Sequence, residues 1–258
     1  MPVITLTSDW GLRDHFLGVV KGRIISKLPK AILIDISHEI SPFNLKQASF
    51  ILRNSYPHYP PGTVHIISLL TEFSENSTHL AVQYGGQYFI GADNGIFSLI
   101  FDKPPQSIIR LGAEKIGIGP EAPARDRFIE AAVHLAEGKP IGDLGVPVSS
   151  WKEQLHFHPV VSGDVIRGVV IYINHYENVV TNIMKDLFQQ VGKGRRFTIE
   201  FRGESVQRLH TSYQDAPVGE IVALFGSTGH LEIAINQGNA SSLLGLEIND
   251  PVRIEFKN

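Results

Sequence analysis

The sequence predicts an α/β fold in which an N-terminal, mostly parallel sheet with flanking helices is followed by a C-terminal β-barrel-like domain. Three observations carry this prediction. In the first half of the chain, β-branched runs alternate with segments of helical periodicity. After about Trp151 the pattern changes to short strands separated by turn residues. A length of 258 residues exceeds what one small core needs, which favours two domains.

The first half of the chain alternates strands with amphipathic helices. Strand-like residues 4–6 precede a helical pattern at 16–24, and strand-like residues 32–36 precede another at 45–52, before a further strand at 64–70. Strands that alternate with helices form a parallel sheet covered on both faces.

Two further elements complete the predicted first domain. The glycine pair at 85–86 separates two alternating runs, residues 80–84 and 88–91, which indicates a β-hairpin. Residues 126–136 have the period of one more helix, and Gly138 stands just beyond its end.

The second half has the pattern of a compact β domain. Short strands are expected at residues 165–173, 197–201, 206–209, 221–225, 231–235 and 252–256. We therefore expect a first domain over residues 1–158 and a second over 159–258.

Composition argues against several kinds of partner. A net charge of -3, with one short basic cluster at 193–196, predicts no nucleic-acid binding. The apolar runs are too short to span a membrane, and the N-terminus has no signal-peptide pattern, so a cytoplasmic location is expected. With no cysteine, and with His156 and His158 lacking a third ligand nearby, no metal site is expected.

Residues that directly follow predicted strands are the first candidates for a site, because α/β sheets bind ligands beyond the carboxyl ends of their strands. Asp9 follows the first strand, where a carboxylate can accept hydrogen bonds from both hydroxyls of a ribose. It could equally cap the next helix. Phe43, after the second strand, suits either an aromatic pocket wall or the core.

Two more positions carry groups that could transfer a proton. The loop after the third strand contains Glu72 and Glu75, although most such loops are only solvated. His134 lies on an otherwise apolar helix face, where a hydrogen-bonded core histidine and a catalytic or orienting histidine are both possible. No glycine-rich phosphate loop follows any strand.

Together these segments resemble one family across nearly the whole chain, the S-adenosylmethionine hydroxide adenosyltransferases, which are related to the fluorinases and chlorinases. The resemblance rests on ordered motifs: LTSDWG at 6–11, RD at 13–14, GVVKG at 18–22, IDISHEISP at 34–42, PPGTVH at 60–65, ADNG at 92–95, the helix at 125–136, NVVTNI at 178–183 and GSTGHLEIAIN at 226–236.

The resemblance implies a homotrimer that binds S-adenosylmethionine between one subunit's first domain and its neighbour's second. It implies that Asp9 binds the ribose hydroxyls and that Phe43 lines the pocket. In the second domain it assigns Tyr176 and Asn178 to the nucleoside, Ser227 to the methionine end and the backbone near Gln237 to the adenine edge; Asn174 stands where the family usually has Asp.

The expected reaction is hydrolysis of S-adenosylmethionine to adenosine and methionine, with water attacking C5′ and no separate cofactor. Hydrolytic members of the family activate water with an Asp, an Arg and a His. Here residues 70–74 replace the stretch that contains the Asp, and Ser77 and Thr78 replace the Arg. By resemblance His134 is retained, so we expect His134 to hold the water, with Glu72 in place of the missing Asp.

Two other functions fit parts of the pattern. A halogenating relative would carry a Ser where Val133 stands, and would have a long insertion where the chain has the short turn at 84–86. A non-catalytic protein that binds the adenosyl ligand would keep the pocket and lack the missing Asp and Arg.

Overall fold

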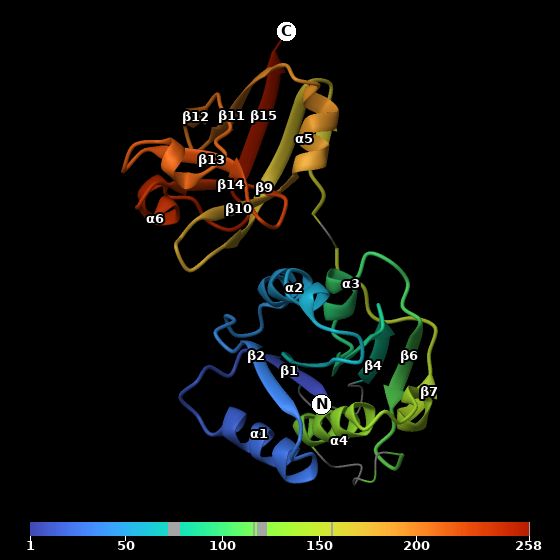
Figure 1. The fold of residues 1–258 in the computed structure, drawn as a ribbon. Coiled ribbons are helices and arrows are strands. Elements are labelled where there is room, and N and C mark those ends of the chain that lie inside the picture. Colours follow the sequence, from blue (N-terminus) through green and yellow to red (C-terminus); the bar gives the residue numbers. More distant parts are fainter. Residues whose placement is uncertain (72–77, 116, 118–122, 156, 258) are drawn as a thin grey trace. The chain divides into compact units, whose positions relative to one another are not determined.

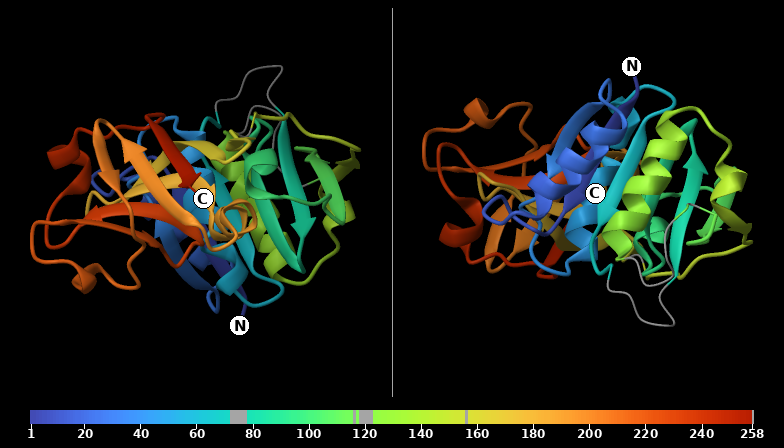
Figure 2. Two further views of the ribbon diagram at one scale, coloured as in Figure 1. Left: turned by 90° about the horizontal axis from the view of Figure 1, so that it is seen from above. Right: turned by 90° about the horizontal axis from the view of Figure 1, so that it is seen from below.

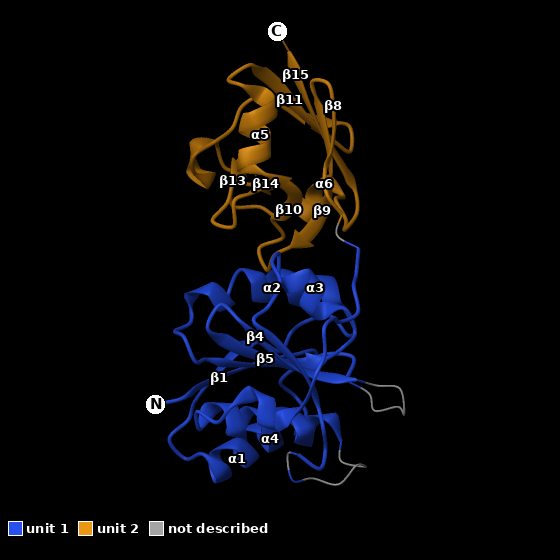
Figure 3. Ribbon diagram, turned by 90° about the vertical axis from the view of Figure 1, so that its right-hand side faces the viewer, with its two compact units in different colours: residues 1–155 blue, residues 156–258 orange. Residues whose placement is uncertain are grey.

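The computed structural model describes residues 1–71, 78–115, 117, 123–155 and 157–257 (Figure 1). The chain divides into two compact units, Met1–Leu155 and His156–Asn258 (Figure 3). Glu72, a predicted catalytic residue, lies outside the described residues. In the part of the chain that is described, no helix is long and apolar enough to cross a membrane.

Unit 1 is built on a mixed sheet with strand order β2-β1-β3-β5-β4-β6-β7. Its strands are β1 (Val3–Ser8), β2 (Ile32–Ser37), β3 (Val64–Ser68), β4 (His79–Tyr84), β5 (Gln87–Ala92), β6 (Ser107–Leu111) and β7 (Gly145–Pro147). β2, β1, β3 and β5 pair in parallel, whereas β4, β6 and β7 pair antiparallel. The predicted hairpin is β4–β5, and Gly85 and Gly86 form its turn with positive φ angles.

Helices cover both faces of this sheet (Figures 1 and 3). On one face α1 (Phe16–Lys27) and α4 (Ala124–Ala136) pack Val20, Ile24 and Phe128 into a core with β1 and β3. On the other, α2 (Leu45–Arg53) and α3 (Ile96–Ile100) form a second core. The remaining short helices are η1 (Tyr56–His58) and η2 (Ile141–Leu144). The expected layers are confirmed.

α1 and α4 lie side by side beneath the sheet (Figure 2, right). Arg23 pairs with Asp126, and Lys27 pairs with Glu130 at 2.9 Å. Ion pairs near the surface add at most about 1 kcal/mol each. Beside α1, the first turn of α4 lies next to the carboxyl ends of β1 and β3.

Unit 2 is an antiparallel, nearly closed barrel, which confirms the predicted β architecture. Its elements are β8 (Val160–Ser162), β9 (Val165–Ile173), β10 (Val179–Met184), α5 (Lys185–Gly192), β11 (Arg196–Phe201), β12 (Glu204–Val206), η3 (Tyr213–Asp215), β13 (Ile221–Phe225), β14 (His230–Ile235), α6 (Ala240–Leu244) and β15 (Pro251–Lys257). Phe188 of α5 packs edge-on against Phe197, Phe225 and Phe256, closing the core on one side.

The strand expected at 206–209 is wrong in its extent, since β12 is Glu204–Val206. Beyond Val206 the chain leaves β11 and turns toward β13, where the His210 backbone N–H donates to Ala223 O at 2.7 Å. The hydrogen bond between His210 and Ala223 of β13 therefore accounts for the end of β12 at Val206.

Candidate functional site

The carboxyl ends of three parallel strands meet at one edge of unit 1. In the strand register Ser8 of β1 lies beside Ser68 of β3, and Thr7 lies beside Ser37 of β2. His38 follows directly after β2. Because parallel strands end at the same edge of a sheet, residues far apart in sequence become neighbours there.

Asp9 begins the loop that leaves this edge. Its Oδ2 accepts a hydrogen bond from the Phe43 backbone N–H at 2.9 Å. The helix-cap alternative is wrong, because α1 begins at Phe16 with His15 at its N-cap and no side chain caps it. Among the described residues this is the one hydrogen bond to the Asp9 carboxylate, so its other oxygen remains available to a ligand.

Phe43 is exposed over 65% of its surface, which excludes the core alternative for this side chain. Its backbone has φ +66, in the left-handed region that side chains other than glycine seldom occupy. Such strain persists where neighbouring contacts enforce it, and it concentrates at binding sites. The Asp9 carboxylate supplies one such contact.

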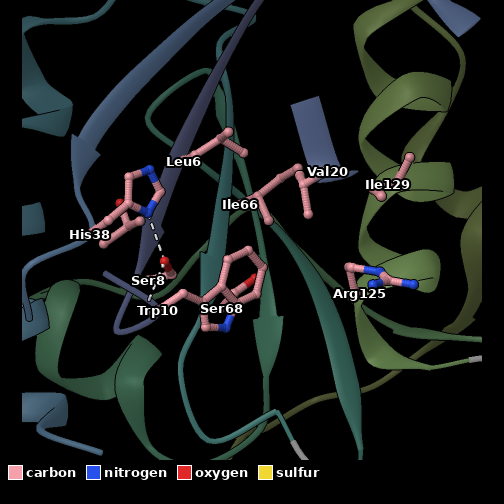
Figure 4. A pocket seen from close by; sticks show the side chains of 10 residues that line it. Leu6, Ser8, Trp10, Val20, His38, Ile66, Ser68, Arg125 and Ile129 are labelled. Carbon is pink, nitrogen blue, oxygen red and sulfur yellow. Dashed lines mark hydrogen bonds between the residues drawn. The ribbon is translucent and has the colours of Figure 1, made fainter. Parts of the chain in front are cut away.

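A small cavity lies beside Ser8, between the strand ends and the first turn of α4 (Figure 4). Its volume is about 10 Å³, the lower limit for a single water molecule. Ser8, Ser68, His38, Trp10 and Arg125 line it together with apolar side chains. This end of the cavity faces the N-terminus of α4 and the guanidinium of Arg125, whose Nε donates to Asp126 Oδ1 at 2.9 Å.

A row of polar contacts runs from this cavity to the surface. Ser8 Oγ and His38 Nδ1 are 2.6 Å apart, His38 Nε2 lies 3.2 Å from Asp35 Oδ1, and Lys21 Nζ donates to Asp35 Oδ2 at 2.6 Å. Ser8 and His38 are both buried. Partial burial opposes ionisation of Asp35, but the hydrogen bond from Lys21 and the nearby His38 ring outweigh it and keep the carboxyl pKa below its usual value.

Sequence reasoning did not assign Ser8, Asp35 or His38. All three lie in the motifs at 6–11 and 34–42, and the signal was available. An Asp and a His three residues apart at the end of one strand, next to a Ser at the end of its parallel neighbour, must converge at the carboxyl edge.

His134 does not lie at this edge. It stands in the last turn of α4, and its Nε2 is 2.8 Å from the Pro140 carbonyl oxygen. Arg125, which lines the cavity, belongs to the first turn of the same helix. Nine residues of helix separate the two side chains by about 13 Å along the axis. The structure therefore gives His134 a local hydrogen bond and does not bring it to Asp9.

Four of the predicted ligand residues in unit 2 gather at one end of its sheet. Asn174 Oδ1 accepts from the N–H groups of Tyr176 and Asn178 at 2.9 and 3.0 Å, closing the turn between β9 and β10. The Tyr176 side chain is exposed, and Asn178 is buried. Gln237, with φ +55, follows β14, whose end pairs with the start of β10.

Ser227 lies elsewhere in unit 2. It belongs to the turn between β13 and β14, whereas Gln237 follows β14, so the two residues are separated by a strand's length of roughly 17 Å. Between them the buried Glu232 accepts a hydrogen bond from the Tyr213 hydroxyl at 2.6 Å. Burial and the contact with Glu232 raise the pKa of Tyr213, which keeps this hydroxyl a donor.

No cluster of three metal-binding side chains occurs among the residues that the structure describes. The polar groups of unit 1 instead form two adjacent features, the Asp9–Phe43 contact and the cavity beside Ser8. One can hold hydroxyl groups of a ligand, and the other has room for one small molecule such as water.

The chain thus combines an α/β domain that has polar residues at its strand ends with an antiparallel barrel. Models of protein families identify the class of protein that has these two domains. The model of the SAM hydroxide adenosyltransferase N-terminal domain matches residues 4–145, and that of the C-terminal domain matches residues 168–253. The chain belongs to the SAM hydroxide adenosyltransferase family, as the sequence resemblance indicates.

Similar proteins extend over the full length of the chain. The (R)-S-adenosyl-L-methionine hydrolase of Thermus thermophilus is 30% identical, and the match covers 98% of this chain and 100% of that protein. A fluorinase of Actinoplanes sp. is 23% identical over 91% of each chain. The crystal structure of an uncharacterized conserved protein from Thermotoga maritima superposes with a TM-score of 0.89 at 28% identity, covering 98% of this chain and 99% of that one.

Proposed function

We propose that this chain hydrolyses S-adenosyl-L-methionine to adenosine and L-methionine. Membership of the family and a full-length relative named as an (R)-S-adenosyl-L-methionine hydrolase support the reaction. The structural observation that carries it is the Asp9–Phe43 contact, which orients a carboxylate and an exposed aromatic ring at the end of the first strand. A carboxylate so placed accepts hydrogen bonds from ribose hydroxyls, and the ring covers an apolar face of the ligand.

The reaction makes modest chemical demands on the protein. A sulfonium is a good leaving group because it departs as a neutral thioether. The protein therefore has chiefly to align a water molecule behind C5′, opposite the sulfur, and to remove its proton. Both tasks need only side chains, so S-adenosylmethionine enters as substrate and no further cofactor is required.

The remaining ligand contacts come from residues 159–258. We infer that Tyr176 and Asn178 contact the nucleoside, that Ser227 binds the methionine end and that the backbone at Gln237 meets the adenine edge. The strand's length between Ser227 and Gln237 suits a ligand that lies extended along β14. Asn174 Oδ1 accepts two backbone hydrogen bonds and shapes the turn between β9 and β10, and its neutral amide brings no negative charge to the site.

A turnover and binding assay tests the proposal. The purified chain is incubated with each sulfonium epimer of S-adenosylmethionine separately, products are separated by chromatography, and affinity is measured by calorimetry. We expect adenosine and methionine in equal amounts. Asp9→Ala should weaken binding by about 100-fold, because it removes two charge-assisted hydrogen bonds. Asp143→Ala, which removes an exposed carboxylate from η2, is the matched control and should bind as wild type.

A non-catalytic ligand-binding protein is the second candidate, and the replacement of the family Asp and Arg at 70–74 and 77–78 favours it. Saturable binding of S-adenosylmethionine without release of adenosine would establish this function and exclude hydrolysis. A halogenase would instead form a 5′-halogenated nucleoside when fluoride or chloride is supplied.

We also propose that the active form is a homotrimer with its ligand sites between subunits, which rests on the family resemblance. Light scattering on the eluting protein tests this directly. A mass three times that of the chain is expected, and a monomer that turns over substrate would contradict it.

A further inference from the structure

We propose that Ser8, His38 and Asp35 form a buried proton relay that accepts the proton of the attacking water, in place of the absent family Asp and Arg. This inference rests on the proposed hydrolysis and assigns its base. The relay does not use His134, which lies at the far end of α4 from the cavity.

The contacts of His38 indicate which of its two ring nitrogens carries the proton. Asp35 Oδ1 lies 3.2 Å from Nε2, within ion-pair distance but outside hydrogen-bond geometry, and its negative charge favours the tautomer that carries the proton there. Nδ1 is then the acceptor, and Ser8 Oγ–H donates to it across 2.6 Å. The order of groups from the cavity outward is hydroxyl, imidazole, carboxylate and ammonium, the last being Lys21 at 2.6 Å from Asp35.

Ser8 has a lone pair to offer to a water molecule. A hydroxyl has one donor and two acceptor sites. Ser8 Oγ accepts one weak hydrogen bond, from the Trp10 backbone N–H at 3.4 Å, and its proton is directed to His38. The second acceptor site remains for the cavity that Ser8 lines (Figure 4).

The cavity supplies the other partners that such a water needs. Ser68 and Arg125 line it together with Ser8, which meets the requirement of two to four polar neighbours for a buried water. Leu6, Val20, Ile66 and Ile129 form its apolar walls and keep other water away. The Arg125 guanidinium also favours the negative charge that develops on the water oxygen as its proton leaves.

Asp9 places this water next to the substrate. Asp9 is the residue after Ser8, and its carboxylate is the proposed ribose ligand. The proposal places the C5′ end of a ribose held by Asp9 toward the end of β1, where the cavity lies. The same short segment, residues 8–10, thus contributes the ribose ligand, the first relay group and a wall of the water site.

In the proposed step, water displaces methionine from C5′. The water oxygen forms a bond to C5′ while the C5′–S bond breaks, and the electron pair of that bond stays on sulfur as the thioether of methionine. The water proton passes to Ser8 Oγ as the Ser8 proton passes to His38 Nδ1. The resulting imidazolium is stabilised by Asp35 and later releases its proton to solvent, so no oxidant, reductant or metal is consumed.

Steady-state kinetics of three variants test the relay: Ser8→Ala, Ser8→Thr and His38→Asn. Removal of a general base costs on the order of 100-fold or more in rate. We expect Ser8→Ala and His38→Asn to lower kcat by at least that factor, with KM and the calorimetric affinity within about threefold of wild type. Ser8→Thr keeps the hydroxyl and should restore most of kcat, an effect that a purely structural role would not produce. His58→Asn, on the exposed helix η1, is the matched histidine control.

The outcomes separate the relay from the proposed function. If wild type releases no adenosine, hydrolysis and relay are both overturned. If wild type turns over and Ser8→Ala and His38→Asn have wild-type kcat, only the relay is overturned. A loss that appears entirely in KM and affinity would also overturn it, because the residues would then hold the binding loop and carry no proton. Circular dichroism verifies that each variant is folded.

Discussion

Phe43 is held in a backbone conformation that costs free energy, with its ring in solvent. A left-handed residue other than glycine costs about 1–2 kcal/mol, and an exposed ring recovers little of that by burial. The Asp9 carboxylate fixes the Phe43 backbone N–H, so one contact couples the proposed ribose ligand to the proposed pocket wall. Replacing Phe43 should therefore change the stability of the fold and the affinity for the ligand in opposite directions.

Replacing Phe43 by Gly tests that opposition. Glycine adopts positive φ freely, so Phe43→Gly should raise the free energy of unfolding by about 1 kcal/mol. Loss of the ring should weaken binding of S-adenosylmethionine roughly tenfold. Phe43→Ala is the control, because it loses the ring and keeps the backbone strain; it should bind as weakly as the Gly variant without gaining stability. Urea unfolding and calorimetry provide the two measurements, and equal stability of the two variants would contradict the strain argument.

The surroundings of two glycines, one in β9 and one in α1, determine what an added methyl group would do to stability. A Cβ at Gly168 of β9 would lie 2.5 Å from Asn182 Oδ1 and 2.5 Å from Ile183 Cγ1 of β10. A Cβ at Gly18 of α1 would meet nothing within 4 Å. β9 can therefore approach β10 this closely only because residue 168 has no side chain. The packing around Gly18 in α1 does not require a glycine.

Gly168→Ala should therefore destabilise the protein by about 1–3 kcal/mol through overpacking. Gly18→Ala should stabilise it by up to about 1 kcal/mol, the difference in helix propensity. Denaturant unfolding of both variants measures the two signs. A stability gain at Gly168 would show that β10 moves away at little cost.

Elements with strong periodicity were predictable, and short or context-dependent ones were not. α1, α2 and α4 follow from apolar positions three and four residues apart, and the hairpin β4–β5 follows from its two glycines. The sequence interpretation did not include α5, although its apolar side chains lie on one face and complete the aromatic core of unit 2. β12 ends early because the chain is drawn to β13, which is a tertiary effect.

Parts of the candidate site were also predictable from the sequence. Asp9 and Phe43 were identifiable because residues after strands of an α/β sheet form ligand sites. The contact between Ser8 and His38 follows from the same reasoning about strand ends, although the sequence interpretation did not include it. The position of His134 along α4 relative to the strand ends depends on helix placement, which one sequence does not specify.

At the scale of the whole molecule, two buried histidines make the stability of unit 1 depend on pH. Burial lowers the pKa of His65 to about 4, although Gln87 bonds its ring. Burial, and then the charge of Arg127, lower the pKa of His79 to about 4. In the unfolded chain both rings regain an ordinary pKa near 6.5. Above pH 6.5 both imidazole rings are neutral in the folded and in the unfolded chain, so the stability has its full value. It falls only as the pH drops from 6.5 toward 4.

The expected loss between pH 7.5 and pH 5 is about 2 kcal/mol for each histidine. Both tryptophans, Trp10 and Trp151, lie in unit 1, so tryptophan fluorescence during urea unfolding reports this unit alone. His79→Phe cannot be protonated and should reduce the pH dependence by about half. A wild-type unit 1 that is equally stable at both pH values would show that the two rings are protonated in the folded state as well.

The proposed hydrolysis requires that water attacks C5′ of S-adenosylmethionine, and incorporation of oxygen from water into adenosine measures that attack. The reaction is run in water enriched in heavy oxygen, and the products are analysed by mass spectrometry. We predict adenosine that carries the heavy isotope at its 5′-oxygen, together with unlabelled methionine. Bound but unreacted S-adenosylmethionine, or adenosine without the label, would contradict the account.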